Sequence, residues 1–500
     1  MQNSPGDRSG GSWLLTLGSD HQTRDVPVVV IIGGGVSGTG VAFHLLQRQS
    51  LQAGQVFIFE PRERLGAGLA YDTQDAAHRI NVPAARMSLL PDDIEHFQRW
   101  MLENNALADD DAAIAADGNL FPRRSVFGNY INSMIRPFVE SGRLRHVRQS
   151  VERVQRMGGR WAVTGADGAN VDADILVIAT SHPSPLPPQL LRDALADHPR
   201  FVPDPARPDA LAAIRADDRV LVVGNGLTSA DVIASLEHRG HKGPLTAISR
   251  RGLRSRGHAA VKQEPLGDFA SQPSKTAVEL LRSVRAAIRQ AEGKGLSWHA
   301  VIDQIRTQGR QIWQALPTEE RRRLVRHLRP FWDVHRFRIA PQVEAVSERA
   351  LANGRLEVLA ASVAEVGVAD DVIDCRLRLS RSKRFVRRQF DAVVVTTGPG
   401  HRGILQSQAW IDQLSQAGYL ALDPTRLGFS CDTQSRALAD DGTVIPSLFI
   451  SGPLARGTFG ELMGLPEVVE HAVLVADQVA GAIAGHTHGQ RKAYWDSSAA

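Results

Sequence analysis

Two glycine-rich loops carry the residues whose spacing points most directly to chemistry. In the first loop, Gly33, Gly35 and Gly38 form a G-x-G-x-x-G pattern directly after the apolar run 28–32, with Ser37 inside the turn. The first glycine of such a loop makes a tight turn, the second lets a pyrophosphate approach the backbone, and the third lets the following helix pack on the strand. The positive start of that helix attracts phosphate groups. We therefore expect this loop to bind a dinucleotide.

The second loop follows the apolar run 220–223 and contains Gly224, Gly226, Thr228 and Ser229. Ser229 stands where the pattern has its third glycine. A strand before the loop and a helical pattern after it form the context in which such a motif is informative. Two loops of this kind predict two dinucleotides, one of which would pass electrons to the other.

The residue that follows the next strand indicates which dinucleotide each loop binds. Glu60 ends the buried run 56–59 and is placed to accept hydrogen bonds from an adenosine ribose. The matching run in the second half, 245–249, is followed instead by Arg250 and Arg251. Arginine there attracts a 2′-phosphate, which favours NADPH over NADH, although the pair could equally form a solvated turn. The nicotinamide cofactor is therefore left as NAD(P)H.

The composition excludes several classes of protein. The chain has 500 residues and a formal net charge of only +4, which suits two or three domains and predicts no nucleic-acid partner. Its two cysteines, Cys375 and Cys431, form no CxxC pair, which argues against a thiol-disulfide reductase and fits a reducing cytoplasm. The sequence contains no tight cluster of His, Cys and Glu such as HExxH, so no metal site is predicted.

The sequence also gives no sign of membrane targeting. We find no continuous stretch of roughly 18 apolar residues, the length needed to cross a bilayer. Residues 1–25 lack the basic start of a signal peptide and are predicted to be a disordered leader. We therefore expect a cytoplasmic protein with no membrane partner, and the oligomeric state is left open.

A second repeat follows each loop. The segments 142–154 and 354–366 share Gly-Arg-Leu and Ser-Val at the same spacing, and each leads through a polar meander to a buried strand. The sequence therefore predicts an α/β protein with two Rossmann-like dinucleotide-binding domains, the second inserted within the first and carrying a helical insertion. The predicted parts are the first domain (26–200), the second domain (215–390) with helices near 275–329, and a return segment (391–500) with a C-terminal helix near 466–484.

Further stretches resemble those of a known family. They are GAGLAY at 66–71, INVPAARMS at 80–88, RRSVFGNY at 123–130, WDVHRFRIAP at 332–341 and GPLARG at 452–457. With the two loops, these stretches resemble the flavoprotein monooxygenases that have two dinucleotide-binding domains. The resemblance covers nearly the whole chain beyond residue 25. Within this group the chain is most similar to the bacterial FAD-dependent urate hydroxylases of the same type.

The resemblance implies cofactors and a reaction. FAD would occupy the first domain and NAD(P)H the second, and O2 would add to the reduced flavin to give a C4a-hydroperoxide. That species would hydroxylate a small anionic heterocycle, with urate to 5-hydroxyisourate, a step of purine degradation, as the best single expectation. The Asp-Gly and Gly-Asp motifs of the aromatic hydroxylases are missing. Segment 174–180 resembles the closing motif of amine N-hydroxylases, but Ser181 stands where that family has glycine.

Two other functions therefore stay open at this point. One is an amine or amino-acid N-hydroxylase of the same flavoprotein class, and the other is a nucleotide-binding sensor without turnover. Product analysis separates the first from urate hydroxylation, because N-oxidation gives a stable hydroxylamine.

Several residues are candidates for the site itself. Asn81 and Arg86 lie in an irregular loop, where Asn81 could contact the flavin and Arg86 could attract an anion. Gly452 follows the last buried strand, and the helix after Pro466 could direct its positive end at the flavin. Urate is an anion that needs cations and a base, so four residues are catalytic candidates, although each could equally be structural. They are His258, His335, Arg336 and Arg456.

Overall fold

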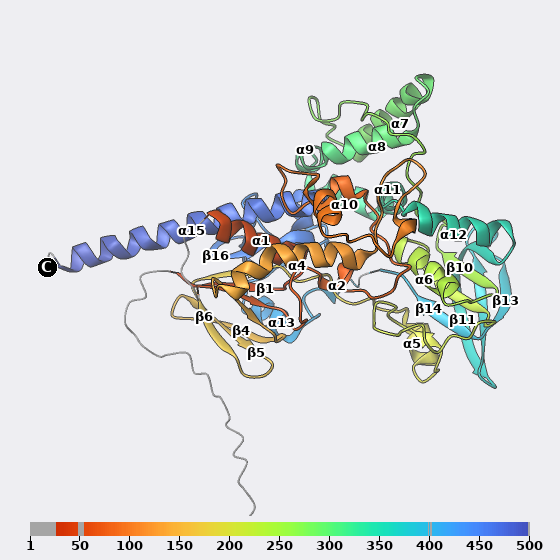
Figure 1. Ribbon diagram of the computed structural model, residues 1–500, viewed down its shortest axis with the longest axis horizontal. Coiled ribbons are helices and arrows are strands. Elements are labelled where there is room, and N and C mark those ends of the chain that lie inside the picture. The colour runs from red at the N-terminus through yellow and green to blue at the C-terminus, as the bar shows by residue number, and fades with distance from the viewer. Residues whose placement is uncertain (1–26, 49–54, 399, 401–402, 499–500) are drawn as a thin grey trace, which may run out of the picture.

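The computed structural model describes residues 27–48, 55–398, 400 and 403–498. The predicted leader, residues 1–25, lies outside this described part. Figure 1 shows two α/β domains side by side with a group of helices above them.

The first domain is built on a six-stranded sheet in the order β15-β16-β7-β1-β2-β3. Its strands are β1 (Val29–Ile32), β2 (Val56–Phe59), β3 (Leu144–Val147), β7 (Ile175–Ile178), β15 (Arg436–Leu438) and β16 (Val444–Ile450). All neighbours pair in parallel except β15 and β16. Both faces of the central strands are covered, which explains why these strands are continuous apolar runs rather than alternating ones.

Helices cover one face of this sheet and a smaller sheet covers the other. The helical face holds α1 (Val36–Arg48), α4 (Arg124–Glu140) and α15 (Glu467–Ser498). The opposite face holds the antiparallel sheet of β4 (Val151–Met157), β5 (Arg160–Gly165) and β6 (Asn170–Ala173), together with α13 (Ala409–Gln416).

The second domain contains a seven-stranded sheet in the order β13-β12-β11-β10-β9-β14-β8. Its strands are β8 (Phe201–Val202), β9 (Val220–Val223), β10 (Leu245–Ser249), β11 (Leu356–Ala369), β12 (Val372–Leu379), β13 (Phe385–Phe390) and β14 (Ala392–Val395). Helices α6 (Leu227–His238) and α12 (Pro341–Ala352) pack together on it, and α5 (Gln189–Leu195) contacts the other side.

The two large sheets repeat one plan. The strand before each glycine loop, β1 or β9, lies in the middle, with the next two strands of the chain on one side and the closing strand, β7 or β14, on the other. The registers agree: Val29 pairs with Val56 on one side, and Val220 pairs with Leu245 in the same way. The predicted α/β fold with two Rossmann-like domains is confirmed.

The second sheet is made of segments that lie between β7 and β15 of the first sheet. One predicted boundary differs from the structure. The sequence predicts that the return segment begins at residue 391, but β14 pairs with β9 and β8 of the second sheet. The chain therefore returns to the first domain only after β14.

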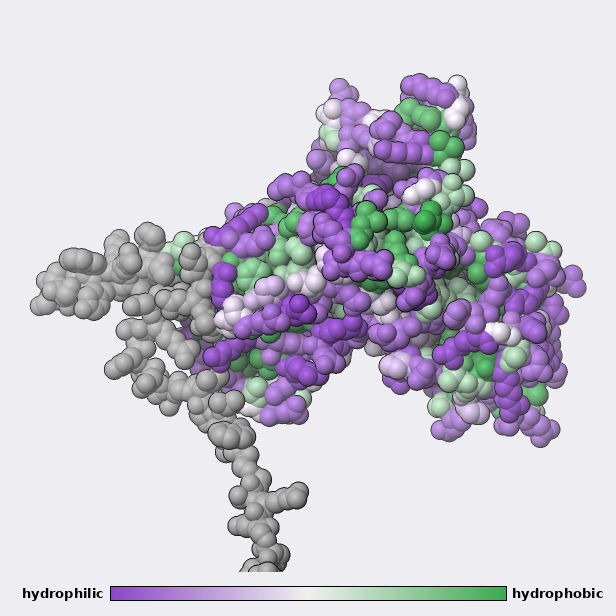
Figure 2. Space-filling model, viewed as in Figure 1, coloured by the Kyte–Doolittle hydropathy of each residue, from purple (hydrophilic) through white to green (hydrophobic). Residues whose placement is uncertain are grey.

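Five helices form the insertion, and those formed by residues 277–307 stand at the top of Figure 1. The five are α7 (Ala277–Gly293), α8 (Trp298–Thr307), α9 (Gly309–Ala315), α10 (Thr318–His327) and α11 (Arg329–Arg336). The insertion thus continues beyond the predicted end near residue 329. Figure 2 shows hydrophobic side chains gathering on this face just below the insertion, between the two domains.

Helix α15 begins at Glu467, directly after Pro466, and extends beyond the predicted end near residue 484. Among the described residues, its part Glu467–Gly485 is long and apolar enough to span a membrane by length and composition. This part is not a continuous apolar run, because it contains Glu467, Glu470 and Asp477. Its apolar side chains pack on α1 in the core of the first domain, which accounts for its hydropathy.

Candidate dinucleotide sites and the interdomain centre

The first loop has the geometry that its glycines predict. Gly33 has a φ of +105°, in the region that favours glycine. A Cβ on Gly38 would lie 1.9 Å from the carbonyl oxygen of Gly33, so no side chain fits there. Glu60 is buried beside the loop and accepts a hydrogen bond from Gly34 N–H at 3.0 Å and one from Arg62 Nη1 at 2.9 Å. The predicted phosphate loop and ribose acceptor therefore lie together.

Two buried hydroxyls next to this loop are left for a ligand. Thr180 follows β7 and Ser451 follows β16, and neither side-chain oxygen has a hydrogen-bond partner within the described residues. A Cβ on the neighbouring Gly452 would lie 2.2 Å from Ser37 Oγ, so the backbone passes close to the start of α1. Orphaned hydroxyls around a glycine cradle are the donor set that the ribityl chain and pyrophosphate of FAD require. The residues present fit FAD.

A buried histidine fixes the backbone at Gly452. His471 Nδ1 accepts a hydrogen bond from Gly452 N–H at 3.1 Å, and its Nε2 lies 3.0 Å from Ser435 Oγ. Burial, with a contribution from Arg310, lowers the pKa of His471 to about 3, so the ring is neutral. A backbone N–H can only donate, which places the ring proton on Nε2. Sequence reasoning missed this residue, because a histidine on a core helix gives no distinguishing pattern.

The second loop is similar but more open. Gly224 has a φ of +119°, and a Cβ on Gly226 would meet no atom within 4 Å. In the described part of the chain, Asn225 Nδ2 and the buried Ser229 Oγ have no hydrogen-bond partner. Thr228 is exposed beside them. These orphaned groups at the start of α6 fit the phosphates of NAD(P)H.

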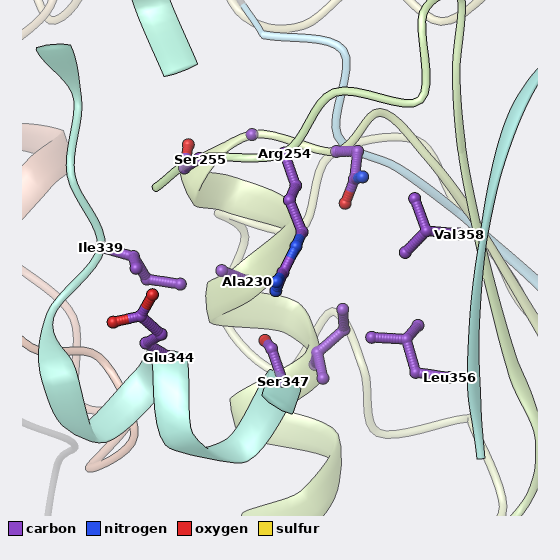
Figure 3. Close-up of a pocket in the computed structure, with 11 residues that line it drawn as sticks. Ala230, Arg254, Ser255, Ile339, Glu344, Ser347, Leu356 and Val358 are labelled. Atoms are coloured by element: carbon purple, nitrogen blue, oxygen red, sulfur yellow. The ribbon is translucent and has the colours of Figure 1, made fainter. Parts of the chain in front are cut away.

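A pocket opens next to this loop, between α6, α12 and β11. Asn225, Gly226, Arg254, Glu344 and Ser347 are among the residues that line it. Figure 3 shows the Arg254 side chain running into this pocket from the loop after β10. Burial and the neighbouring Glu348 raise the pKa of Glu344. The pocket therefore joins a phosphate loop to Arg254, whose guanidinium pairs with Glu348 in this structure.

The two arginines predicted for the 2′-phosphate lie elsewhere. Arg250 and Arg251 are exposed, and the guanidinium of Arg251 lies over the ring of Phe331 at 5.3 Å. Arg254, a few residues later, is the arginine that lines the pocket. The sequence did not single out Arg254, because no residue period indicates which side chain of an irregular loop enters a pocket.

Charged residues gather where the insertion, the 80–88 loop and α15 meet; we call this group the central charge cluster. Arg306 donates to both carboxylate oxygens of Glu467. Arg338 pairs with Asp303 at 2.8 Å, and Arg336 Nη2 lies 3.0 Å from Glu461 Oε1. The members are Arg86, Asp303, Arg306, Arg336, Arg338, Glu461 and Glu467.

Arg86 is the one member of this cluster for which the described residues provide no ion pair. Its side chain is exposed, yet desolvation lowers its pKa, and nearby Arg306 and Arg338 lower it further against the opposing charges of Asp303 and Glu467. Three arginines and three acids neutralise one another, so Arg86 leaves the cluster with a positive charge. That Arg86 attracts an anion stays a prediction.

The start of α15 carries a carboxylate. Burial alone would raise the pKa of Glu467, but the hydrogen bonds and charge of Arg306 outweigh this effect and lower it. Arg306 also donates to the carbonyl of Leu465 just before the helix. The positive helix end predicted to face the flavin is therefore partly neutralised by its own first residue and held by the insertion.

The four catalytic candidates do not form one group. His258 is linked through Nε2 to the carbonyl of Asn81 at 3.0 Å, and His335 Nδ1 donates to Phe331 O of its own helix. Arg336 belongs to the central charge cluster. Arg456 lies in α14 (Arg456–Phe459), and its Nε and Nη1 have no hydrogen-bond partner among the residues described.

The electrostatics of these candidates differ. Burial and Arg338 lower the pKa of His258 to about 4, so this ring is neutral and a weak base near pH 7. Burial and Arg329 lower the pKa of Arg456 to about 10, and the group stays cationic. His258 therefore lacks the charge of a base poised near neutral pH.

Asn81 connects the two domains. Its Oδ1 accepts a hydrogen bond from Ala340 N–H at 3.2 Å, and its carbonyl is bonded to His258. Both of its partners lie in the second domain. The sequence predicts that Asn81 contacts the flavin, whereas in the structure its side-chain and backbone oxygens bond to the second domain.

Comparisons with known proteins agree with this fold. Residues 30–183 match the family model described as FAD-NAD(P)-binding. No curated protein matches the chain. Among solved structures, ornithine hydroxylase from Pseudomonas aeruginosa is 18% identical with a TM-score of 0.60, covering 92% of this chain and 99% of that one.

Two further structures are similar. L-lysine 6-monooxygenase from Pseudomonas syringae is 17% identical with a TM-score of 0.58, and 92% of this chain and 99% of that chain are covered. The FAD-bound cadaverine monooxygenase from Erwinia amylovora is 14% identical with a TM-score of 0.59, and the coverage is 91% and 95%. At these identities the likeness is one of fold. Together with the family match and the two glycine loops, it identifies a protein that binds FAD and NAD(P)H.

Proposed function

We propose that this chain is an FAD- and NAD(P)H-dependent monooxygenase that hydroxylates the primary amine of a small, carboxylate-bearing substrate. The observation that carries the proposal is that one domain has a site that fits FAD, and the domain in contact with it has a site that fits NAD(P)H. This arrangement lets one dinucleotide reduce the other. The similar structures include hydroxylases of ornithine, lysine and cadaverine, which supports amine N-hydroxylation over the urate hydroxylation predicted from sequence.

The proposed reaction balances without a metal or a further reductant. The amine R–NH2, O2, NAD(P)H and a proton give the hydroxylamine R–NHOH, water and NAD(P)+. One oxygen atom enters the new N–O bond, and the other leaves as water with two protons and the electron pair of the nicotinamide hydride. Bound FAD supplies the route by which that electron pair activates O2.

The chain's own residues have three tasks in this proposal. Thr180, Ser451 and the Gly33–Gly38 cradle hold the FAD, and His471 keeps Gly452 in place. Asn225, Ser229 and Arg254 hold NAD(P)H. Arg86, at the centre between the domains, provides the positive charge for a substrate carboxylate, since it has no ion pair of its own within the described residues.

The test is NADPH and NADH oxidation by FAD-loaded protein with L-ornithine, L-lysine, cadaverine or urate. We expect an amino acid to stimulate oxidation and to yield a product one oxygen atom heavier that retains its amine nitrogen as hydroxylamine, detected by mass spectrometry. Oxidation that is independent of every amine and yields only hydrogen peroxide would contradict the proposal.

The same assay separates the other two functions. Urate-stimulated oxidation with loss of the ultraviolet absorbance of urate would restore the prediction made from the sequence resemblance. A protein that binds both dinucleotides but whose flavin is not reduced by NAD(P)H without oxygen would be a sensor. Anaerobic loss of the yellow colour therefore decides between enzyme and sensor before any substrate is known.

A further inference from the structure

Helix α6 is buried on two sides. Its apolar residues Val232, Ile233 and Leu236 pack in the core of the second domain. Its small residues Ala230 and Ala234 lie instead in a core cluster shared with the first domain. The helix that begins at the second phosphate loop is thus also a wall of the interdomain contact.

Two polar residues on the same helix, one turn apart, bind the first domain. Asp231 pairs with Arg124 Nη2, which lies 2.8 Å from Oδ2 and 3.1 Å from Oδ1. Ser235 Oγ lies 3.1 Å from His78 Nε2. Asp231 and Ser235 are both buried, so these are specific contacts in a region with little water.

The partners in the first domain are themselves fixed. Arg124 N–H donates to His78 O at 2.9 Å, and Arg124 Nε donates to Arg79 O at 2.8 Å. The Arg79 side chain is buried and makes two hydrogen bonds to the carboxylate of Asp110. Two hydrogen bonds therefore hold Arg124 to the backbone of the first domain, so it would not follow α6 if the second domain moved.

The position of α6 determines where NAD(P)H lies. Gly226 caps the helix, and at the same end Asn225 and Ser229 present polar groups that have no hydrogen-bond partner within the described residues. Asp231 follows this end by one helical turn. A shift of α6 relative to the first domain would therefore shift the bound dinucleotide relative to FAD, and hydride transfer requires the two reacting atoms to be in close contact.

We propose that Arg124 and His78 are positioning residues that dock α6, through Asp231 and Ser235, in the orientation that permits hydride transfer from NAD(P)H to FAD. This inference rests on the proposed function for its reductive step. It adds a second role for α6. The start of the helix binds NAD(P)H, and the side of the helix that contacts the first domain fixes the position of NAD(P)H relative to FAD.

The test is anaerobic stopped-flow reduction of FAD-loaded protein by NADPH, which separates the rate constant of flavin reduction from the apparent Kd for NADPH. We expect Arg124→Gln and Asp231→Asn to lower the rate constant at least tenfold while the Kd changes less than about threefold. The double variant should be no slower than the slower single variant, because the two changes remove the same ion pair.

A matched control lies on the same helix. Glu237 of α6 pairs with Arg349 of α12, inside the second domain, at 2.9 Å. Arg349→Gln removes an ion pair from α6 without touching the interdomain contact and should leave the rate constant unchanged. If the Arg124 variants lose FAD or fail to fold, Ser235→Ala and His78→Gln carry the same test with no buried charge left unpaired.

Hydrogen exchange of the α6 amides in the FAD-loaded protein gives a readout that does not depend on turnover. We expect faster exchange in the Asp231→Asn variant than in the Arg349→Gln control. Unchanged or faster flavin reduction in the interdomain variants would overturn the positioning role. If NAD(P)H did not reduce the flavin of the wild-type protein, the proposed function would instead be overturned. Hydrogen exchange of the α6 amides would then still test whether these residues dock α6 on the first domain.

Discussion

Glu60 Oε2 accepts a hydrogen bond at 3.0 Å from the backbone N–H of Gly34, which lies 26 residues earlier in the chain. This contact ties the end of β2 to the phosphate loop after β1. It places the carboxylate at the position where an adenosine ribose is bound in Rossmann-like domains. Arg62, which also bonds to Glu60, keeps the charge of this buried group compensated.

Replacing Glu60 should weaken FAD binding. In Glu60→Ala the Gly34 N–H and the ribose both lose a charged acceptor, so we expect the Kd for FAD to rise about 10- to 100-fold. Titration of the apoprotein by flavin fluorescence measures this change. Glu152→Gln, at an exposed site in the same domain, is the control. An FAD affinity equal to that of the wild type would show that Glu60 does not reach the cofactor.

Arg254 should set the preference between NADPH and NADH. The guanidinium lines the pocket beside Asn225 and Gly226, where a 2′-phosphate could form charge-assisted hydrogen bonds. For Arg254→Gln we expect the KM for NADPH to rise about 10- to 100-fold and the KM for NADH to stay within about twofold. Arg250→Gln is the matched control, because Arg250 is exposed. Equal losses with both cofactors would mean that Arg254 supports the pocket without recognising the phosphate.

Arg86 should select substrates that carry a carboxylate. Because its positive charge is not neutralised within the central charge cluster, Arg86→Met should raise the KM for L-ornithine or L-lysine about 10- to 100-fold. Cadaverine, which has no carboxylate, should be a poor substrate of the wild type and should be little affected by the change. Anaerobic flavin reduction without substrate should also be unaffected. A changed Kd for FAD or NADPH in this variant would assign Arg86 to a cofactor instead.

The parts of this site that could be predicted from sequence are those fixed by short-range geometry. The turn at Gly33, the close approach at Gly38 and the acceptor Glu60 follow from a spacing that only one local structure satisfies. The repeat after each loop gave the duplicated plan. By contrast, Arg306 and Glu467 are 161 residues apart, and His258 and Asn81 are 177 apart. Such pairs depend on how separate elements pack against each other. The residue periodicity of a single sequence does not indicate this packing.

His258 should make the protein less stable in mild acid. The unfolded chain accepts a proton on this histidine with an ordinary pKa of 6.5, whereas burial and Arg338 lower the pKa in the folded protein to about 4. The folded state therefore binds fewer protons between these values. The contribution of His258 to the free energy of unfolding is fully present above pH 6.5. It falls as the pH drops toward 4, and the loss is about 2 kcal/mol at pH 5.

The charged groups around His258 act in both directions: Asp303 raises its pKa, whereas Arg338 and His299 lower it. His258→Gln removes the titration and keeps an N–H that can donate to the Asn81 carbonyl. We expect the thermal midpoint of the wild type to fall by several degrees more than that of His258→Gln between pH 7.5 and pH 5.0. His335→Gln is the control, since the hydrogen bond of this ring within the described residues is to Phe331 of its own helix, and the ring is partly accessible to water. Parallel losses in the wild type and in His258→Gln would show that the interdomain contact at Asn81 tolerates a protonated ring.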